Sequence, residues 1–427
     1  MKKGLSARFL CALSVFGLVG QIAWVVENMY LNVFMYKMFG ASAEDISLMV
    51  SASAVTAALT TVFIGALADK LGKRRVFISG GYVLWGISIL GFTLVRREVI
   101  GALFPTAASW AAIGISAVII LDCLMTFFGS SANDAAFNAW LTDSVENDER
   151  GRAEGINAVM PLVAILAVFG GFMAFDLGKS DSWTLIFLII GVAVIGVGIL
   201  GLFIIDEPKI EPSREPYLRT VIHGFLPRVI RENKGLYLYL ALFIIFNTSI
   251  QIFMPYLILY YEVSLGMADY VLIMAPAIVL ASVFTVFWGK AYDRLGFGLT
   301  AWVSLGALSV GYVLLFFFTG TALVFIGSLL MMCGYLSGMA VFGAIIRERI
   351  PEGRAGMFQG VRIFSQVLVP GVVGPFIGKT VLKNAKTVTG SDGTVSFIPS
   401  ADIFLAALAA AAVLAAALVA VRVVRKK

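Results

Sequence analysis

The stretch GALADKLGKRR, residues 65–75, decides the fold, because it returns later in the chain as GKAYDRLG, residues 289–296. A second echo links GRAEG, residues 151–155, to GMFQG, residues 356–360. Repeats at such distances predict a chain built from two similar halves in the same orientation. The first pair of segments shares one pattern of glycine, aspartate and glycine, and its two copies are 224 positions apart. The pattern occurs at Gly65, Asp69 and Gly72, and again at Gly289, Asp293 and Gly296.

The composition is that of a membrane protein. Of the 427 residues, 60% are hydrophobic and only 14% are charged, and the mean hydropathy is +0.94. A typical soluble domain has about 25% charged residues, so this composition excludes an ordinary soluble enzyme. A helix that crosses the bilayer needs about 20 apolar residues. Twelve runs meet this length, at 9–36, 46–68, 76–95, 108–140, 155–176, 183–205, 236–261, 268–291, 298–318, 321–346, 357–381 and 401–424.

The basic residues predict the orientation. An even number of spans puts both ends on one side, and that side would carry 24 of the 32 Lys and Arg residues. Because basic residues concentrate in cytoplasmic loops, both termini are expected in the cytoplasm, in a cell (inner or plasma) membrane. The same rule accounts for the net charge of +6, so no nucleic-acid partner is expected. The first apolar run has no clear cleavage site, and we expect it to be retained as a membrane helix.

Three domains follow from the span pattern. We expect a six-helix bundle over 1–205, a cytoplasmic linker over 206–235 and a second six-helix bundle over 236–427. Apolar residues between Leu218 and Ile230 recur at helical spacing, which predicts an amphipathic helix in the linker. This segment could have a regulatory role, or it could simply connect the two bundles. The polar stretch 383–400 is expected to be an exposed loop on the opposite side.

The repeated loop has a physical interpretation in its first copy. Gly65 is expected to allow close packing of the second helix, and Gly72 to permit a tight turn. Asp69 would lie at the end of the second helix, where it can accept hydrogen bonds from a facing helix N-terminus. A simple cytoplasmic turn would explain the basic residues after Gly72. It would not explain why the pattern of Gly, Asp and Gly occurs twice.

With this loop, the sequence resembles the major facilitator superfamily, whose loop pattern is Gly-x3-Asp-(Arg/Lys)-x-Gly-(Arg/Lys)-(Arg/Lys). The second copy lacks the trailing basic residues, since Phe297 and Gly298 stand there. The resemblance implies an all-α membrane protein, with twelve transmembrane helices in two six-helix pseudo-symmetric bundles, that works by alternating access. It also implies that the loop aspartate latches against the start of the eleventh helix. The residues carried over to this latch are Gly65, Asp69, Gly72, Arg74, Gly289, Asp293 and Gly296.

Charged side chains within the spans are candidate coupling sites, because a charge at membrane depth is costly. The acids are Glu27 in the first helix and Asp122 and Asp134 in the fourth, and Arg362 lies early in the eleventh. Each has a structural alternative. Glu27 could form an interhelical ion pair, Asp122 could bond a facing helix end, Asp134 could lie at the cytoplasmic interface, and Arg362 could extend to the cytoplasm.

Polar and aromatic side chains on the first, fourth, seventh and eleventh helices are candidates for substrate binding. In the superfamily that the chain resembles, these helices line the central cavity. Gln359, Arg362 and Gln366 share one face of the eleventh helix. The amides of the seventh helix could instead join helices, and the aromatic residues could be packing anchors. The full set is Trp24, Asn28, Asn133, Asn138, Trp140, Asn247, Gln251, Tyr256, Gln359, Arg362 and Gln366.

A finer resemblance concerns the fourth helix. The segment NDAAFNAW, residues 133–140, followed by Asp148-Glu149-Arg150, is similar to the glycoside–pentoside–hexuronide:cation symporters, the melibiose-carrier-like family. The region of Trp24 and Glu27 also resembles proton-coupled sucrose carriers. These likenesses imply that Asp134 binds sugar or is linked to the cation. The paired acids that the sodium-using members carry in the second helix are absent, since Ala57 and Thr61 stand there.

The sequence therefore predicts a secondary active transporter, a proton-coupled symporter of a sugar or glycoside. Protons are favoured over sodium because no acid occurs between Asp45 and Asp69, within the second helix. The alternative in the same fold is a proton-coupled exporter of amphipathic compounds or drugs. The expected partners are a small hydrophilic solute, the coupling cation and the bilayer, with the chain as a monomer. No enzyme activity, metal or cofactor is expected: His223 is the sole histidine, and no phosphate loop or nucleophile motif occurs.

Overall fold

The computed structural model describes residues 5–104, 109–145, 147–207, 222–351, 355–389 and 395–426. In this part of the chain, 11 helices are long and apolar enough to cross a membrane. One of them, α14 (Val271–Phe317), consists of two spans joined at Gly296, which has φ 70° and ψ 174°. Only glycine adopts this backbone conformation readily, so Gly296 ends the eighth span and the ninth begins at once. The twelve predicted spans are therefore all present.

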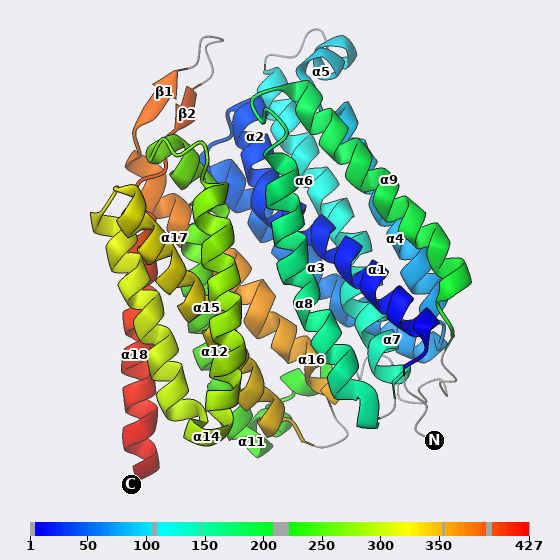
Figure 1. The fold of residues 1–427 in the computed structure, drawn as a ribbon, viewed down its shortest axis with the longest axis vertical. Coiled ribbons are helices and arrows are strands. Elements are labelled where there is room, and N and C mark those ends of the chain that lie inside the picture. Colours follow the sequence, from blue (N-terminus) through cyan, green and yellow to red (C-terminus); the bar gives the residue numbers. More distant parts are fainter. Residues whose placement is uncertain are drawn as a thin grey trace. The chain divides into compact units, whose positions relative to one another are not determined.

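Contacts divide the chain into two compact units. Unit 1 comprises Met1–Ala41 and Ala52–Ile222, and unit 2 comprises Ser42–Ser51 and His223–Lys427. Unit 1 has a short extra helix, α5, between its third and fourth spans. Its elements are α1 (Ala7–Val25), η1 (Val26–Tyr30), α2 (Leu31–Phe39), most of α3 (Ala43–Leu71), α4 (Arg74–Gly91), η2 (Phe92–Leu94), α5 (Arg97–Leu103), α6 (Trp110–Gly129), η3 (Ser130–Phe137), α7 (Asn138–Asp143), α8 (Asn147–Phe172) and α9 (Ser180–Ile204) (Figure 1).

Unit 2 contains the remaining spans and a small hairpin. The predicted loop 383–400 contains two antiparallel strands, with Thr387 opposite Phe397. The elements are η4 (His223–Phe225), α11 (Pro227–Glu232), α12 (Lys234–Phe253), η5 (Met254–Tyr256), α13 (Leu257–Leu259), η6 (Tyr260–Ser264), α14, α15 (Thr321–Arg349), α16 (Ala355–Ile363), η7 (Phe364–Leu368), α17 (Val369–Val381), η8 (Leu382–Asn384), β1 (Thr387–Thr389), β2 (Val395–Phe397) and α18 (Asp402–Lys426).

The two units repeat one packing scheme. In unit 1, the first span packs on the fifth and sixth through α1, α8 and α9, and the third packs on the sixth and fourth through α4, α9 and α6. In unit 2, α12 packs in the same way on α17 and α18, and α14 packs on α18 and α15. Figure 1 shows α4 beside α9, and α12 beside α15. The predicted pair of pseudo-symmetric six-helix bundles is confirmed.

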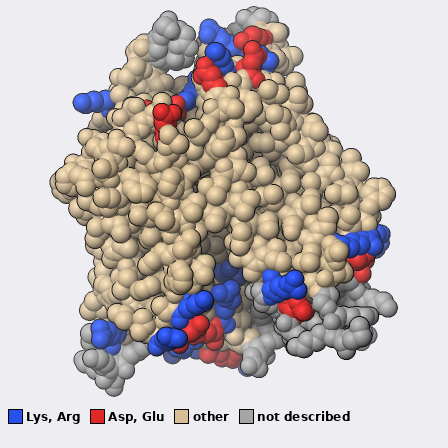
Figure 2. Space-filling view, in the orientation of Figure 1, with Lys and Arg blue, Asp and Glu red and all other residues tan. Residues whose placement is uncertain are grey.

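Glycine permits the closest of these contacts. A Cβ on Gly86 of α4 would lie 2.6 Å from the carbonyl oxygen of Gly191 on α9. Small residues at such crossings let helix backbones approach closely, which is the main source of packing energy between membrane helices. The helix surfaces remain apolar: on the visible face, charged side chains gather near the helix ends, and other residues cover the middle (Figure 2). This surface is suited to a bilayer, and the chain is a multi-pass membrane protein.

The linker differs from its prediction. Residues 208–221 lie outside the described residues, so the Leu218 end of the expected helix does not enter the comparison. The described part does not form one amphipathic helix. The turn η4 and the six-residue α11 are separated by Leu226, whose ψ is 132°. The next residue is Pro227, and a residue before proline is disfavoured in the helical region. The helical spacing of the apolar residues therefore predicted one continuous helix, but Pro227 interrupts it after Leu226.

Candidate functional site

Glu27 is the centre of a buried polar cluster in unit 1. It lies in η1, the π-helical turn that interrupts the first span, and its exposed fraction is 6%. Its Oε1 accepts hydrogen bonds from Ser53 Oγ at 3.1 Å and from Thr126 Oγ1 at 2.8 Å. The two hydroxyl oxygens are themselves 2.6 Å apart. The first, second and fourth spans thus meet at this one carboxyl group.

Asp122 adds a second carboxyl group to this cluster. It precedes Thr126 by one turn of α6, and its exposed fraction is 1%. It interacts electrostatically with Glu27, and Ser53 is also within its reach. Glu27 Oε2 and Asp122 Oδ1 are buried without a hydrogen-bond partner in the described structure. No described Lys or Arg forms an ion pair with either acid, so the interhelical ion pair considered for Glu27 is not observed.

The three oxygens of this cluster make one contact more than their two hydroxyl protons can fill. Ser53, Thr126 and Glu27 Oε1 make three mutual contacts at 2.6–3.1 Å. The two hydroxyl groups can supply protons to only two of these contacts, since each has one O–H. A neutral Glu27 can supply the third. Two ionised carboxylates without a counter-ion would also be costly at this depth. The arrangement is therefore satisfied best when the cluster holds a proton.

Asp134 lies further along the fourth span, in the second π-helical segment of unit 1. Ser130 donates to its Oδ2 at 3.0 Å, and the side chain is half-buried. It interacts electrostatically with Glu27, more weakly than Asp122 does. Asp122, Thr126, Ser130 and Asp134 follow one another at intervals of four residues. Residues at this interval lie on one face of a helix, so Thr126 and Ser130 could have been predicted from the sequence as neighbours of the two acids.

Two of the predicted substrate ligands instead join helices. Asn133 is buried and donates through Nδ2 to the Tyr82 hydroxyl at 2.7 Å, and that hydroxyl donates to the carbonyl of Phe16 at 2.8 Å. Trp140 is buried, and its Nε1 donates to the carbonyl of Asp206 at 3.0 Å. These bonds use the single side-chain N–H of Trp140 and one N–H of the Asn133 side-chain amide. A role of either residue in binding stays a prediction.

The other candidates of unit 1 lie nearer the surface. Asn28 and Asn138 are exposed, and each donates to a backbone carbonyl one turn earlier, that of Trp24 at 2.8 Å and of Asp134 at 3.2 Å. Trp24 is half-buried, with its ring 5.1 Å from that of Trp85. An amide that bonds its own helix still has its carbonyl oxygen for a ligand.

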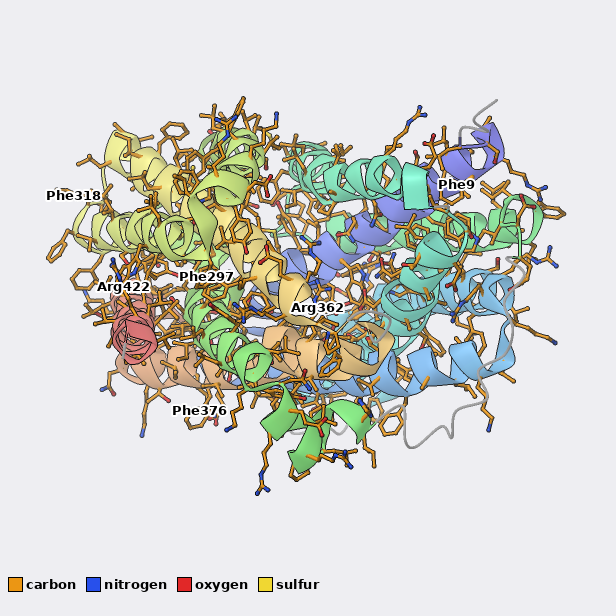
Figure 3. All side chains as sticks on the ribbon, turned by 90° about the horizontal axis from the view of Figure 1, so that it is seen from below. Phe9, Phe297, Phe318, Arg362, Phe376 and Arg422 are labelled. Carbon is orange, nitrogen blue, oxygen red and sulfur yellow. The ribbon has the colours of Figure 1, made fainter. Side chains whose placement is uncertain are left out.

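Unit 2 presents a separate set of polar side chains. Asn247 is buried and donates to the carbonyl of Phe243 at 2.9 Å, within its own helix. Tyr256 is fully buried and donates to the carbonyl of Ala43 at 3.0 Å. Gln251 is half-buried, and so are Arg362 on α16 and Gln366 on η7. Figure 3 labels Arg362 among these residues. The side chain of Gln359 lies outside the described part of the structure. That these residues share one site with the acids of unit 1 stays a prediction.

The repeated loop forms a tight turn in both copies. Gly72 and Gly296 have φ of 62° and 70°, in the left-handed region that a turn without further residues requires. At Gly65 an added Cβ would make an ordinary contact with the side chain of Ala135 at 3.8 Å, so no neighbour among the described residues requires glycine there. Gly289 has open space around it, and Asp293 is exposed. The side chain of Asp69 is outside the described residues, so its latch role stays a prediction.

Arg74 is a buried basic residue of this loop. Its Nε and Nη2 each lie 3.0 Å from Asp143 Oδ2 at the end of α7. The carboxylate of Glu207 accepts the backbone N–H groups of Arg74 and Arg75, the latter at 3.2 Å. A carboxylate at this position also interacts favourably with the N-terminus of α4. The loop is thereby fixed to the end of the fourth span and to the residues after the sixth.

Twelve membrane-spanning helices in two repeated units, with buried acids in the first, define a polytopic carrier of small solutes. The model of the Major Facilitator Superfamily matches residues 6–375. The chain belongs to the Major Facilitator Superfamily, as its loop pattern predicted. It is therefore a transporter.

Solved structures share this fold over nearly the whole chain. Two structures of the nucleoside transporter NupG have TM-scores of 0.74 and 0.72 at 12% identity, covering 96% of this chain and 98% of theirs. An inward-facing bacterial homolog of the human lysosomal transporter Spinster has a TM-score of 0.71 at 14% identity, covering 97% and 96%. The xylose transporter XylE from E. coli has a TM-score of 0.66 at 15% identity, covering 96% and 97%. No curated protein sequence matches the chain.

Proposed function

We propose that this transporter is a proton-coupled symporter of a small hydrophilic solute, with a sugar or glycoside as the first candidate. The observation that carries the proposal is the bonding of Glu27, Ser53 and Thr126. Their three oxygens have fewer hydroxyl protons than contacts, and no described cation pairs with the carboxyl groups. A buried acid that holds a proton in one state and releases it in another can couple a gradient to transport.

A sodium ion fits this cluster less well. The structure does bring hydroxyl groups of the second span next to buried acids, which is the kind of oxygen cluster that a hard cation binds. The three oxygens are, however, only 2.6–3.1 Å apart, as hydrogen-bonded oxygens are. Oxygens that surround one cation lie further from each other, because the ion stands between them. The spacing favours a proton.

The case for a hydrophilic solute rests on unit 2 and on the structural neighbours. Gln251, Arg362 and Gln366 are half-buried, with hydrogen-bonding groups that an apolar cargo would not use. Structures of similar fold belong to a nucleoside transporter and a xylose transporter. At 12% and 15% sequence identity, this likeness is evidence for the fold only. The test therefore includes both sugars and nucleosides. The resemblance to melibiose-like and sucrose carriers stays a prediction.

The test measures internal pH in proteoliposomes while mono- and disaccharides and nucleosides are added outside, with and without sodium. We expect acidification with at least one sugar in sodium-free buffer. Glu27→Gln and Asp122→Asn should abolish acidification but keep solute exchange, because they hold the cluster in its neutral form. Asp134→Asn should weaken one or both signals. Glu98→Gln, a change at an exposed acid, is the matched control.

Three results would overturn the proposal. Solute uptake that requires sodium and moves no protons would transfer the coupling role to sodium. Acidification that persists in Glu27→Gln would remove this cluster from the mechanism. Counterflow of amphipathic cations, with no response to any sugar or nucleoside, would support the exporter that the sequence left open.

A further inference from the structure

The segment that precedes α12, residues 222–234, forms a fixed platform at the end of unit 2. The Tyr237 hydroxyl donates to the carbonyl of Gly224. The His223 ring meets that of Phe358 edge to face, with centroids 6.0 Å apart, and Phe225 meets Phe364 in the same manner at 5.8 Å. The platform is therefore held against α16 and η7, although it is not a long helix.

The outer surface of this platform is both apolar and basic. Ile222, Phe225, Leu226 and Ile230 remain 37–48% exposed despite these contacts. Three exposed cations stand among and after them, at Arg228, Arg231 and Lys234. Arg228 bonds Glu232 at 2.8 Å, whereas Arg231 and Lys234 form no ion pair with any described residue.

The end of α15 adds further positive charge beside this platform. Arg347 and Arg349 are exposed there. The Arg349 guanidinium lies over the Tyr239 ring at 5.6 Å, and its Nη1 is 3.4 Å from where a Cβ of Gly235 would stand. The acid between them, Glu348, accepts a hydrogen bond from the Tyr292 hydroxyl at 2.9 Å. Figure 1 shows α11 at the lower end of unit 2.

We infer that this platform binds the headgroups of anionic phospholipids. Lys234 is the first residue of the seventh span, so the platform lies at the level where headgroups begin. Apolar side chains can enter the boundary of the acyl chains while Arg231, Lys234 and Arg349 contact the phosphates. A neutral headgroup would leave this surplus charge uncompensated, and a soluble anion would leave the four apolar side chains in water. The combination selects an anionic lipid.

The test compares lipid retention by native mass spectrometry of the full chain, purified in detergent and mixed with phosphatidylglycerol or phosphatidylcholine. We expect wild-type protein to retain phosphatidylglycerol in preference. The double variant R231Q/K234Q should lose about tenfold in affinity for it, since each basic residue near an anionic surface contributes on the order of a few-fold. The matched control is K383Q/K386Q, which removes two exposed charges, one in η8 and one directly before β1.

Two further measurements identify the ligand source. Ile230→Ser should weaken retention while keeping every charge, which a purely electrostatic site would not show. Inorganic phosphate at millimolar concentration should not displace the lipid. Equal retention by R231Q/K234Q and wild type, or an equal loss in K383Q/K386Q, would overturn the inference, as would displacement by phosphate alone. Unchanged melting temperatures of the variants exclude misfolding as the cause of a loss.

Discussion

At the scale of single residues, Ser53 is the group through which the second span contacts the buried acid Glu27. Its hydroxyl reaches Glu27, Thr126 and Asp122. Hydroxyl groups are common in membrane helices, and hydropathy does not distinguish Ser53 from Ser51 or Thr56. What distinguishes Ser53 is its short distance to Glu27 and Thr126 on two other spans. In the mechanism that we propose, Ser53 is a positioning residue, because it contacts the acid and not the solute.

We predict that Ser53→Ala shifts the pH dependence of uptake. Removing a donor to Glu27 disfavours the ionised carboxylate, so the proton is released only at higher pH. A hydrogen bond to a charged group contributes about 1.5–3 kcal/mol, so the half-maximal pH should rise by about one to two units. Uptake in proteoliposomes, measured across a series of external pH values, checks this. Ser51→Ala, two residues away on another side of the helix, should keep the wild-type profile. A lower rate with an unshifted profile would indicate a purely structural role.

At the scale of elements, the Asn133–Tyr82–Phe16 chain joins the first, third and fourth spans. We predict that Tyr82→Phe lowers the free energy of unfolding by about 0.5–2 kcal/mol, since two buried groups lose their partner. A double-mutant cycle with Asn133→Ala, followed by thermal unfolding in detergent, measures the coupling. The double variant should lose less than the sum of the single variants. Additive losses would mean that the bond contributes nothing, and lost solute binding in folded Tyr82→Phe would return Asn133 to the substrate site.

The junction inside α14 offers a second test at this scale. Gly296 has φ 70° and ψ 174°, and an added Cβ would meet nothing within 4 Å. Any cost of Gly296→Ala therefore comes from the backbone, and we expect about 1–3 kcal/mol. Gly298 also has open space but a helical backbone, so Gly298→Ala should be neutral or slightly stabilising. Thermal unfolding of the two variants side by side checks the prediction. Equal melting temperatures would show that the turn relaxes without glycine.

At the scale of the whole molecule, hydropathy and one repeated loop were enough to predict the fold. Every span is a long apolar run, and the loop at 65–75 returns at 289–296 with its glycines in step. The two bundles follow because each helix must bury its polar backbone in itself and its small residues against neighbours. The π-helical turns at Glu27 and Asp134 were not predictable, since an inserted residue leaves hydropathy unchanged.

The candidate site was predictable only in part. Glu27, Asp122 and Asp134 stood out because an acid is rare and costly inside a membrane. Their meeting with Ser53 and Thr126 depends on how three spans pack, which no local pattern states. Asn133 and Trp140 drew attention as polar groups in a suggestive motif, yet their N–H groups bond Tyr82 and the carbonyl of Asp206. A sequence indicates which side chains are unusual for a membrane helix. The packing of the helices determines which of their polar groups are still available to bind a ligand.

The orientation of the molecule in the membrane gives the last prediction. Both termini are expected in the cytoplasm, because 24 of 32 basic residues fall on that side. Lys290 and Lys386 are exposed and separated by three spans, so they must lie on opposite sides of the bilayer. After replacement of Cys11, Cys123 and Cys333, Lys386→Cys should react with an impermeant maleimide in intact cells, and Lys290→Cys only after permeabilisation. The reverse pattern would invert the orientation while keeping the fold. Labelling of both positions from one side would contradict the three spans between them, and with them the twelve-helix arrangement itself.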